Sequence, residues 1–202
     1  MLHRTFHSFG LALLGLSVVL TAACNSDDPG LPTSATAAGE LSASAQTADV
    51  DVVVAGGPAI GTVVGQSHLT RNQKGLRGNV RTSGLTPGHV ATMWIVVFQD
   101  PDGCIGACDS PPEDFGPARA ALALAGGTVV PSSGKVTITG KLDVGDATDA
   151  ALFDTPFGSE VHLVIRTHGP VIPGMLDEQM GSLNGGCPPN VCMNVQAARY
   201  VP

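Results

Sequence analysis

Aromatic residues and charges are both scarce in this 202-residue chain. Only 4% of the residues are aromatic, with one Trp and one Tyr, and 13% are charged. The ten basic residues are outnumbered by seventeen acidic ones, which gives a net charge of −7. This shortage of positive charge argues against a nucleic-acid partner, because phosphate binding needs a basic surface. It argues equally against adsorption onto anionic lipid headgroups.

Long hydrophobic runs are nearly absent, and the one near the N-terminus is short. Residues 9–20 are uncharged and apolar, but about a dozen residues is too short to span a bilayer comfortably and is typical of the central part of a signal peptide. Arg4 precedes this run, and small residues follow it up to Cys24. The segment Leu20-Thr21-Ala22-Ala23-Cys24 resembles the lipobox of bacterial lipoproteins, with the leucine one position further from the cysteine than is usual.

That resemblance implies that residues 1–23 are a cleaved signal peptide and that acyl chains, palmitate among them, are attached to Cys24. Several acyl chains on one residue anchor a protein firmly, whereas a single chain holds it only marginally. Asn25 follows the cysteine, and the resemblance to enterobacterial lipoproteins then implies the outer membrane of a cell with two membranes. The alternative is an ordinary secretory signal that is cleaved near Ala22 and Ala23, with Cys24 incidental.

A change in composition separates a linker from a domain. Residues 25–47 are small and polar without apolar periodicity, so they cannot bury enough surface to offset the entropy of ordering. We therefore expect a flexible tether over residues 24–48, which includes the lipidated Cys24, and a single domain over residues 49–202. A protein that is anchored through its N-terminus needs this layout.

Glycine and proline interrupt the domain too often for long helices. The chain has 26 Gly and 15 Pro, and short apolar or alternating segments between turns are typical of strands. We expect an all-β fold, an antiparallel β-sandwich of the immunoglobulin or Greek-key type. The expected strands are 50–54, 60–69, 76–82, 91–98, 127–131, 135–142, 160–167 and 194–201, with a hairpin turn at 72–75. The alanine-rich segment 115–126 is compatible with either a helix or a strand.

Several short motifs resemble known families. The turn Gly84-Leu85-Thr86-Pro87-Gly88 is similar to a corner turn of fibronectin type III domains and of copper/zinc superoxide dismutases, which implies a sandwich architecture and no particular activity. A larger set of segments resembles a family of uncharacterised bacterial exported proteins, and this resemblance brings no established activity. These segments are 81–88, 92–98, 101–104, 166–170 and 185–196.

Four cysteines remain once Cys24 is assigned to lipid: Cys104, Cys108, Cys187 and Cys192. An even number in an oxidising compartment predicts two disulfides, and the short separations favour the local pairs Cys104–Cys108 and Cys187–Cys192. A four-cysteine zinc site is the alternative, because both pairs have spacings close to those of zinc ligands. Neither pair has the C-x-x-C spacing of a catalytic redox pair.

Three histidines are candidate ligands for copper or zinc. Alternation along residues 160–168 predicts an apolar face and a polar stripe that carries His162 and His168, and His89 is a possible third ligand. The alternative, which we prefer, is that the stripe is a solvated outer face. The resemblance to superoxide dismutases implies alternating histidines after the Gly84–Gly88 turn. Only His89 is present there, so a dismutase copper site is not expected.

Positive charge gathers around the first predicted hairpin. Arg71, Lys74, Arg77 and Arg81 form a basic patch that could bind an acidic glycan or a lipopolysaccharide phosphate. Alternatively, these charges only protect an exposed strand or sheet edge from pairing with another chain.

The sequence contains no clear catalytic signature. No G-x-S-x-G, H-E-x-x-H or phosphate-binding glycine-rich motif occurs. The aspartates at 100–103 and 143–149 could bind calcium, but aspartate is also the ordinary residue of turns, and we prefer that explanation. We therefore expect a cell-envelope lipoprotein that is a non-catalytic binding or structural module, with a membrane anchor, an envelope protein or glycan as partner, and no cofactor. The alternatives are a copper- or zinc-dependent or redox enzyme, and a carbohydrate-binding sandwich with Trp94 or Tyr200 as a stacking platform.

Overall fold

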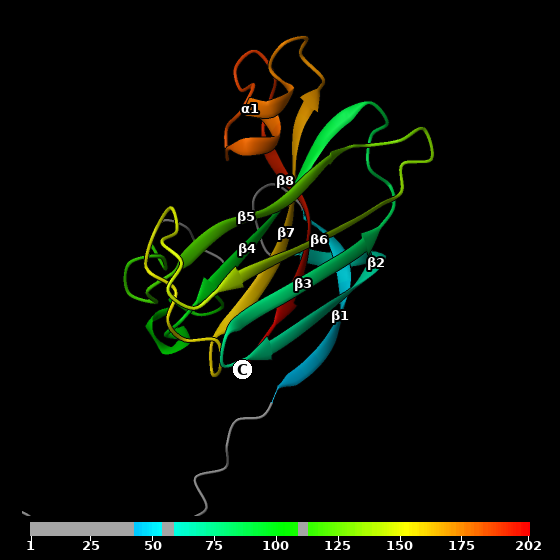
Figure 1. Cartoon of the computed structure of the whole chain (residues 1–202). Helices are drawn as coiled ribbons and strands as arrows, with labels where there is room; N and C mark the ends of the chain where they lie inside the picture. The colour runs from blue at the N-terminus through cyan, green and yellow to red at the C-terminus, as the bar shows by residue number, and fades with distance from the viewer. Residues whose placement is uncertain (1–42, 54–58, 109–112) are drawn as a thin grey trace, which may run out of the picture. The chain divides into compact units, whose positions relative to one another are not determined.

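The structure is a computed structural model that describes residues 43–53, 59–108 and 113–202 (Figure 1). Residues 1–42 lie outside the described residues, and with them the predicted signal peptide, Cys24 and most of the predicted tether.

Eight antiparallel strands form one sheet in the described part of the chain, which confirms the predicted all-β, antiparallel fold. The strands are β1 (Ser44–Val53), β2 (Ala59–Asn72), β3 (Gly75–Thr82), β4 (His89–Phe98), β5 (Ala121–Val129), β6 (Val136–Asp143), β7 (Glu160–Pro170) and β8 (Met193–Tyr200). Their order in the sheet is β5-β4-β7-β8-β1-β2-β3-β6. Two short helices, η1 (Pro101–Gly103) and α1 (Leu176–Gly181), lie in the loops.

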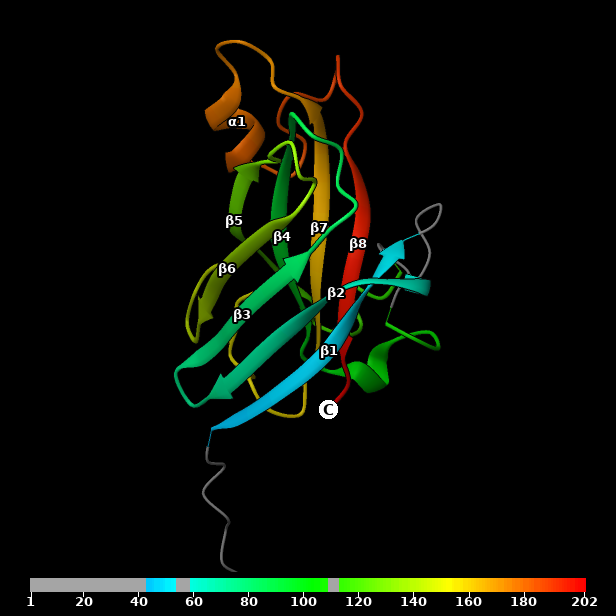
Figure 2. The same ribbon diagram turned by 90° about the vertical axis from the view of Figure 1, so that its right-hand side faces the viewer.

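The sheet curls until its edge strands, β5 and β6, approach each other. Gly140 on β6 makes this approach possible, because a Cβ at this position would overlap Ala125 of β5. β1, β2 and β3 run obliquely to β7 and β8 (Figure 2). The strands of the expected sandwich therefore belong to one nearly closed sheet, with the main core inside it.

Two apolar clusters lie on the two surfaces of the sheet. The inner core lies inside the sheet, and its members on β4 and β7 are Ala91, Met93, Ile95, Val97, Val161, Leu163 and Ile165. The outer cluster packs on the outer surface and consists of Trp94, Val96, Phe98, Cys108, Ala118, Ala120, Leu122 and Val164. Alternate residues of β4 enter opposite clusters, so this strand is buried on both faces.

The β2–β3 hairpin confirms the predicted turn at residues 72–75. The Lys74 N–H donates a hydrogen bond of 2.8 Å to Asn72 Oδ1, and Gly75 has a φ of 143°, a conformation that glycine adopts at little cost. After the turn, the side chains of β3 alternate between the core and the solvent, as the sequence predicts.

Two strands begin earlier than predicted, and one helix was not expected. β1 begins at Ser44, so residues 44–48 lie in the sheet and not in the tether; their backbone pairs with β2, which needs no apolar side chain. The alanine-rich segment is a strand from Ala121 onward, because it pairs with β4 along its whole length. The six-residue helix α1 was not expected.

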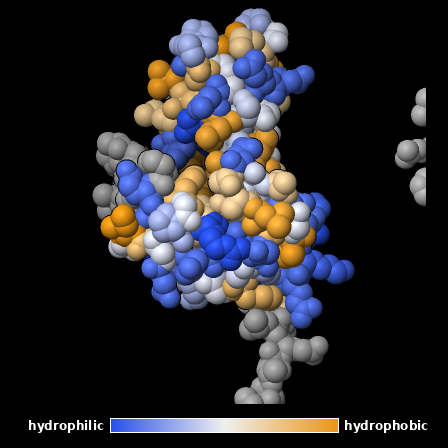
Figure 3. All heavy atoms as spheres, turned by 90° about the vertical axis from the view of Figure 1, so that its left-hand side faces the viewer, coloured by the Kyte–Doolittle hydropathy of each residue, from blue (hydrophilic) through white to orange (hydrophobic). Residues whose placement is uncertain are grey.

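The two ends of the sheet carry different features. At one end, the C-terminus lies near the start of β1, where Gln46 Nε2 donates to the Val201 carbonyl oxygen at 3.5 Å. At the other end, α1 lies beside β5 (Figures 1 and 2). On the face drawn in Figure 3, hydrophobic residues occur in separate groups among hydrophilic ones.

Candidate functional sites

The three histidines that the sequence offers as metal ligands do not converge. His162 and His168 are both on β7, and their six-residue separation places their Cα atoms about 20 Å apart. His89 contacts Thr167 at 3.4 Å, and His162 donates to Glu160 Oε1 at 2.7 Å. Within the described residues, only His168 belongs to a group of potential ligands close enough to share an ion. The predicted three-histidine site is therefore not formed.

His168 is fully buried and does not lie on a solvated face. Its Nδ1 lies 3.0 Å from the Gly185 carbonyl oxygen, which can only accept, so Nδ1 carries the proton. The Thr92 hydroxyl then donates to Nε2 at 2.9 Å and itself accepts from Trp94 Nε1 at 2.9 Å. Burial lowers the pKa of His168; the bond to Gly185 raises it and the charge of Arg166 lowers it again, and the net direction is down. The imidazole is therefore neutral at neutral pH and hydrogen-bonded at both nitrogens.

The loop between β7 and β8 covers this part of the sheet. Arg166 Nε donates to the Leu183 carbonyl oxygen at 2.7 Å, and its Nη2 donates to the Cys192 carbonyl oxygen at 3.4 Å. The buried Gln179 of α1 donates to the Pro170 carbonyl oxygen at 3.0 Å. The polar stripe of β7 is thus a surface on which a loop docks, which corrects the expectation of a solvated outer face.

Both predicted local disulfides are confirmed. The Cα atoms of Cys104 and Cys108 are 5.2 Å apart, and those of Cys187 and Cys192 are 5.8 Å apart. Because each pair is bonded within itself, the alternative four-cysteine zinc site is not formed. Disulfides form and persist in oxidising compartments, which indicates a non-cytoplasmic location.

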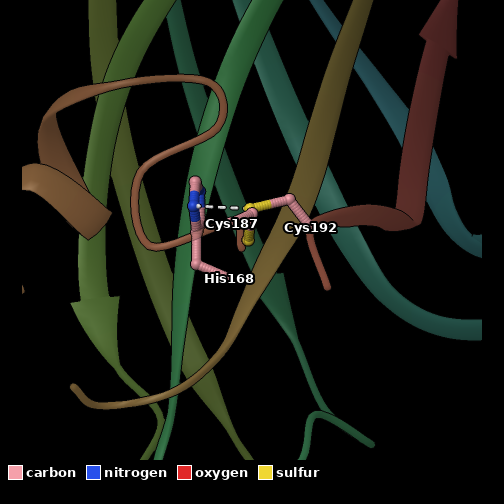
Figure 4. Close-up of side chains that lie close together, drawn as sticks. All are labelled: His168, Cys187 and Cys192. Atoms are coloured by element: carbon pink, nitrogen blue, oxygen red, sulfur yellow. Dashed lines mark hydrogen bonds between the residues drawn. A yellow bond between two sulfur atoms is a disulfide. The ribbon is translucent and has the colours of Figure 1, made fainter. Parts of the chain in front are cut away.

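One of these disulfides lies against His168 (Figure 4). The Cys192 Sγ atom is 3.4 Å from His168 Nδ1, and the potential ligand atoms of His168, Cys187 and Cys192 all lie within 4.8 Å of one another. No spacing motif in the sequence joins the cysteines to this histidine, and the loop that brings them together contains the unexpected α1. While the disulfide is closed, neither sulfur is a thiolate and neither can bind a metal ion in the usual way.

A buried carboxylate links β7 to β8 near the opposite end of β7. Glu160 accepts hydrogen bonds from His162 at 2.7 Å and from Arg199 at 2.6 and 2.9 Å. Burial raises the pKa of Glu160, but the hydrogen bonds from His162 and Arg199 outweigh burial and hold this pKa below its usual value. The group is ionised at neutral pH and stabilises the pairing of the two strands.

Arg71 does not belong to the predicted basic patch. It is only 3% exposed, because it lies on the same inward face of β2 as Leu69. Its Nη1 donates to the carbonyl oxygens of Pro156 at 3.1 Å and Ser159 at 2.8 Å, and its Nε donates to Gln46 Oε1 at 2.9 Å. Burial lowers the pKa of Arg71. The guanidinium therefore ties the loop before β7 to β2 and is not available to a ligand.

The other three residues of that patch, Lys74, Arg77 and Arg81, are exposed. Lys74 lies in the hairpin turn, whereas Arg77 and Arg81 are on the outward face of β3. Lys141 of β6 lies directly opposite Arg77, and His68 is exposed on the neighbouring β2. We call the outward surface of β2, β3 and β6 that carries His68, Arg77, Arg81 and Lys141 the basic face.

A hollow of about 600 Å³ crosses the basic face from β2 to β5. It is lined by His68, Thr70, Arg77, Gly78, Asn79, Leu124, Ala125, Thr139, Gly140 and Lys141. None of these residues is acidic. In the described part of the chain Arg77 and Arg81 form no ion pair, whereas Lys141 pairs with Asp143 at the end of β6. The hollow thus combines cations with hydroxyl and amide groups.

Two further sequence-based candidates have structural explanations. Trp94 and Tyr200 are 2% and 3% exposed, so neither ring is available as a stacking platform for a sugar. In the acidic turn after β6, Asp146 Oδ2 accepts the Asp143 N–H at 2.9 Å, which is the turn chemistry that the sequence favours.

Comparisons with family models, with curated proteins and with solved structures found no match. Among the described residues, no helix combines the length and the apolar character that crossing a membrane requires.

Proposed function

We propose that the protein is an exported lipoprotein whose β-domain is a non-catalytic module that binds an acidic glycan of the cell envelope through the basic face. The observation that carries this proposal is the gathering of cations on the basic face of a chain whose net charge is −7, with His68, Arg77 and Lys141 lining the hollow and Arg81 on the same face of β3. In the described residues Arg77 and Arg81 have no carboxylate partner, and such guanidinium groups are suited to the carboxylates of a uronic-acid chain.

The groups between these cations fit a sugar better than a bare anion. Thr70, Asn79 and Thr139 line the same hollow, and their hydroxyl and amide groups can both donate to and accept from sugar hydroxyls. The backbone of Gly78 and Gly140 lines the same hollow between these side chains. An acidic glycan uses the cations through its carboxylates and both the donors and the acceptors of these groups through its hydroxyls, whereas an ionised phosphate can only accept hydrogen bonds from them.

The anchor in this proposal is the lipid on Cys24, with the outer membrane favoured by Asn25. Nineteen residues, 25–43, separate Cys24 from the first residue of β1, and a chain of that length reaches at most about 65 Å. The domain can therefore contact glycans that lie well beyond the lipid headgroups. The two disulfides support the same location, since they need an oxidising compartment.

Calorimetric titration tests the glycan-binding proposal. Full-length protein in detergent is titrated with oligogalacturonate and with its methyl ester, which has the same sugars without the charge. We expect saturable binding of the acid form alone. Arg77→Gln should weaken it about tenfold or more, since a hydrogen bond to a charged group is worth about 1.5–3 kcal/mol. Arg119→Gln is the matched control, because Arg119 lies off the basic face and pairs with Asp154.

Two results would overturn glycan binding: equal affinity for the acid and the ester, or equal loss of affinity in the two variants. Binding to anionic vesicles in place of the oligosaccharide would assign the basic face to lipid. The anchor is tested separately by mass spectrometry of the N-terminal peptide. We expect an acylated Cys24 as the first residue, and a free thiol or another first residue contradicts the lipoprotein proposal.

A further inference from the structure

In the group formed by His168, Cys187 and Cys192, the separation between nitrogen and sulfur matches that of a zinc site. In tetrahedral sites the Zn–S distance is about 2.3 Å and the Zn–N distance about 2.0 Å, so a nitrogen and a sulfur on the same ion lie about 3.6 Å apart. The separation of 3.4 Å between His168 Nδ1 and Cys192 Sγ is close to that value. The spacing of the two cysteines, with four residues between them, also lies within the range of zinc-ligand pairs.

We propose that reduction of the Cys187–Cys192 disulfide creates a binding site for one Zn²⁺ ion, with His168 Nδ1 and the two thiolates as ligands. A dithiol reductant delivers two electrons and two protons to the disulfide and is itself oxidised to a disulfide. Zn²⁺ then displaces both thiol protons as it binds the sulfurs. With the disulfide closed the site does not exist, so the redox state of this pair decides whether zinc binds. This inference does not rest on glycan binding.

The surroundings of His168 suit a bound ion. A zinc ion on Nδ1 requires the imidazole proton to be on Nε2, where Thr92 Oγ1 lies 2.9 Å away and can accept it. Thr92 Oγ1 then accepts from both Nε2 and Trp94 Nε1, and the Gly185 carbonyl oxygen, 3.0 Å from Nδ1, gives up the ring proton in favour of the ion. Water supplies the fourth ligand, as at other three-ligand zinc sites.

The two cysteines are accessible enough for this chemistry. Cys187 and Cys192 are partly exposed, whereas His168 is fully buried behind them. The Arg166 guanidinium binds the Cys192 carbonyl oxygen at 3.4 Å, and a neighbouring cation stabilises a thiolate. A reductant and an ion therefore reach the partly exposed sulfurs of Cys187 and Cys192 from solvent, and the ion then contacts the buried imidazole of His168.

The other disulfide is an internal control. Cys104 and Cys108 are also closely spaced, but in the described part of the chain no histidine or carboxylate joins them in a group of three potential ligands. Reduction of this pair is expected to give two thiols without a zinc site.

Differential alkylation of the unmodified full-length protein tests the proposal. Both disulfides are reduced anaerobically with a phosphine, which supplies the same two electrons, and the reductant is removed. Iodoacetamide is then added with and without Zn²⁺, and each cysteine peptide is quantified by mass spectrometry. We expect zinc to slow alkylation of Cys187 and Cys192 about tenfold or more, since a zinc-bound thiolate is not a free nucleophile, and to leave Cys104 and Cys108 unchanged.

Elemental analysis gives the second readout. The reduced protein should retain one zinc ion per chain, and the oxidised protein none. Cys187→Ser/Cys192→Ser should lose this zinc, whereas Cys104→Ser/Cys108→Ser should keep it. If the first double variant does not fold, the alkylation of the wild type decides the question. Equal alkylation with and without zinc, or equal protection of both cysteine pairs, overturns the proposal.

Discussion

Arg77 on β3 lies directly opposite Lys141 on β6, so two cations stand side by side on neighbouring strands. Like charges in this position destabilise a sheet. We therefore expect Arg77→Gln to leave the free energy of unfolding unchanged or to raise it by up to about 0.5 kcal/mol, while it weakens glycan binding. Urea unfolding measures the free energy of unfolding of the variant and of the wild type. A loss of more than about 1 kcal/mol, which is beyond the usual range for surface substitutions, would mean that Arg77 has a structural role.

Arg71 is expected to show the opposite behaviour. Arg71→Met keeps an unbranched stem as far as the position of Nε but leaves the carbonyl oxygens of Pro156 and Ser159 without their donor. The cost should be about 2–3 kcal/mol of stability, since each buried acceptor loses its hydrogen bond. Affinity for oligogalacturonate, measured on the folded fraction, should not change. A weaker affinity with unchanged stability would mean that Arg71 contacts the glycan, and would contradict its structural role.

The hydrogen bonds of His168 should make it one of the most sensitive polar positions in the domain. His168→Gln removes the partner of Thr92 or of Gly185, because a glutamine cannot reach both. We expect a loss of about 2–4 kcal/mol in chemical unfolding, as for other broken buried networks. His89→Gln is the control, since this half-buried ring makes only a 3.4 Å contact with Thr167. Similar losses in both variants would contradict the assigned network.

The lowered pKa of His168 gives stability a pH dependence of definite sign. The unfolded chain takes up a proton near the ordinary pKa of 6.5, whereas the buried imidazole of the native state resists protonation until lower pH. The contribution of His168 is therefore complete above this value and falls below it, by at most about 1.4 kcal/mol per pH unit.

Unfolding experiments between about pH 7.5 and pH 5 measure this slope. Glu160, whose pKa is also lowered, contributes stability that is lost only as pH falls below its usual 4.5, so its effect lies outside this range. His168→Gln should remove the His168 part of the slope. A variant with the same slope as the wild type would show that another group is responsible.

The parts of the fold that could be predicted are those that local pattern determines. The turn at 72–75 and the alternation of β3 depend on neighbouring residues, and β4 is apolar from Met93 to Phe98. The burial of Arg71 could also have been predicted, because residues two apart on a strand face the same side and Leu69 is buried. The general preference of arginine for the surface outweighed that signal in the sequence-based interpretation.

The candidate sites depended more on distant contacts. Alternation correctly placed His162 and His168 on the face of β7 opposite the inner core, but it could not show that this face is covered. The cover comes from the loop before β5, which is distant in the sequence, and from the loop that follows β7, whose docking back onto the strand no local pattern predicts. Cys192 lies close to His168 because the loop between β7 and β8 docks on β7, and no spacing motif in the sequence predicts this contact.

Glycan binding at the basic face is tested most directly by locating the glycan on the folded protein by NMR. Amide resonances of the full-length protein in detergent micelles are followed during titration with oligogalacturonate. We expect the shifts to concentrate on β2, β3 and β6 around Arg77, Arg81 and Lys141, and to vanish with the methyl ester. Shifts concentrated at α1 or in the loop that follows β4, or no shifts at all, would contradict this proposal.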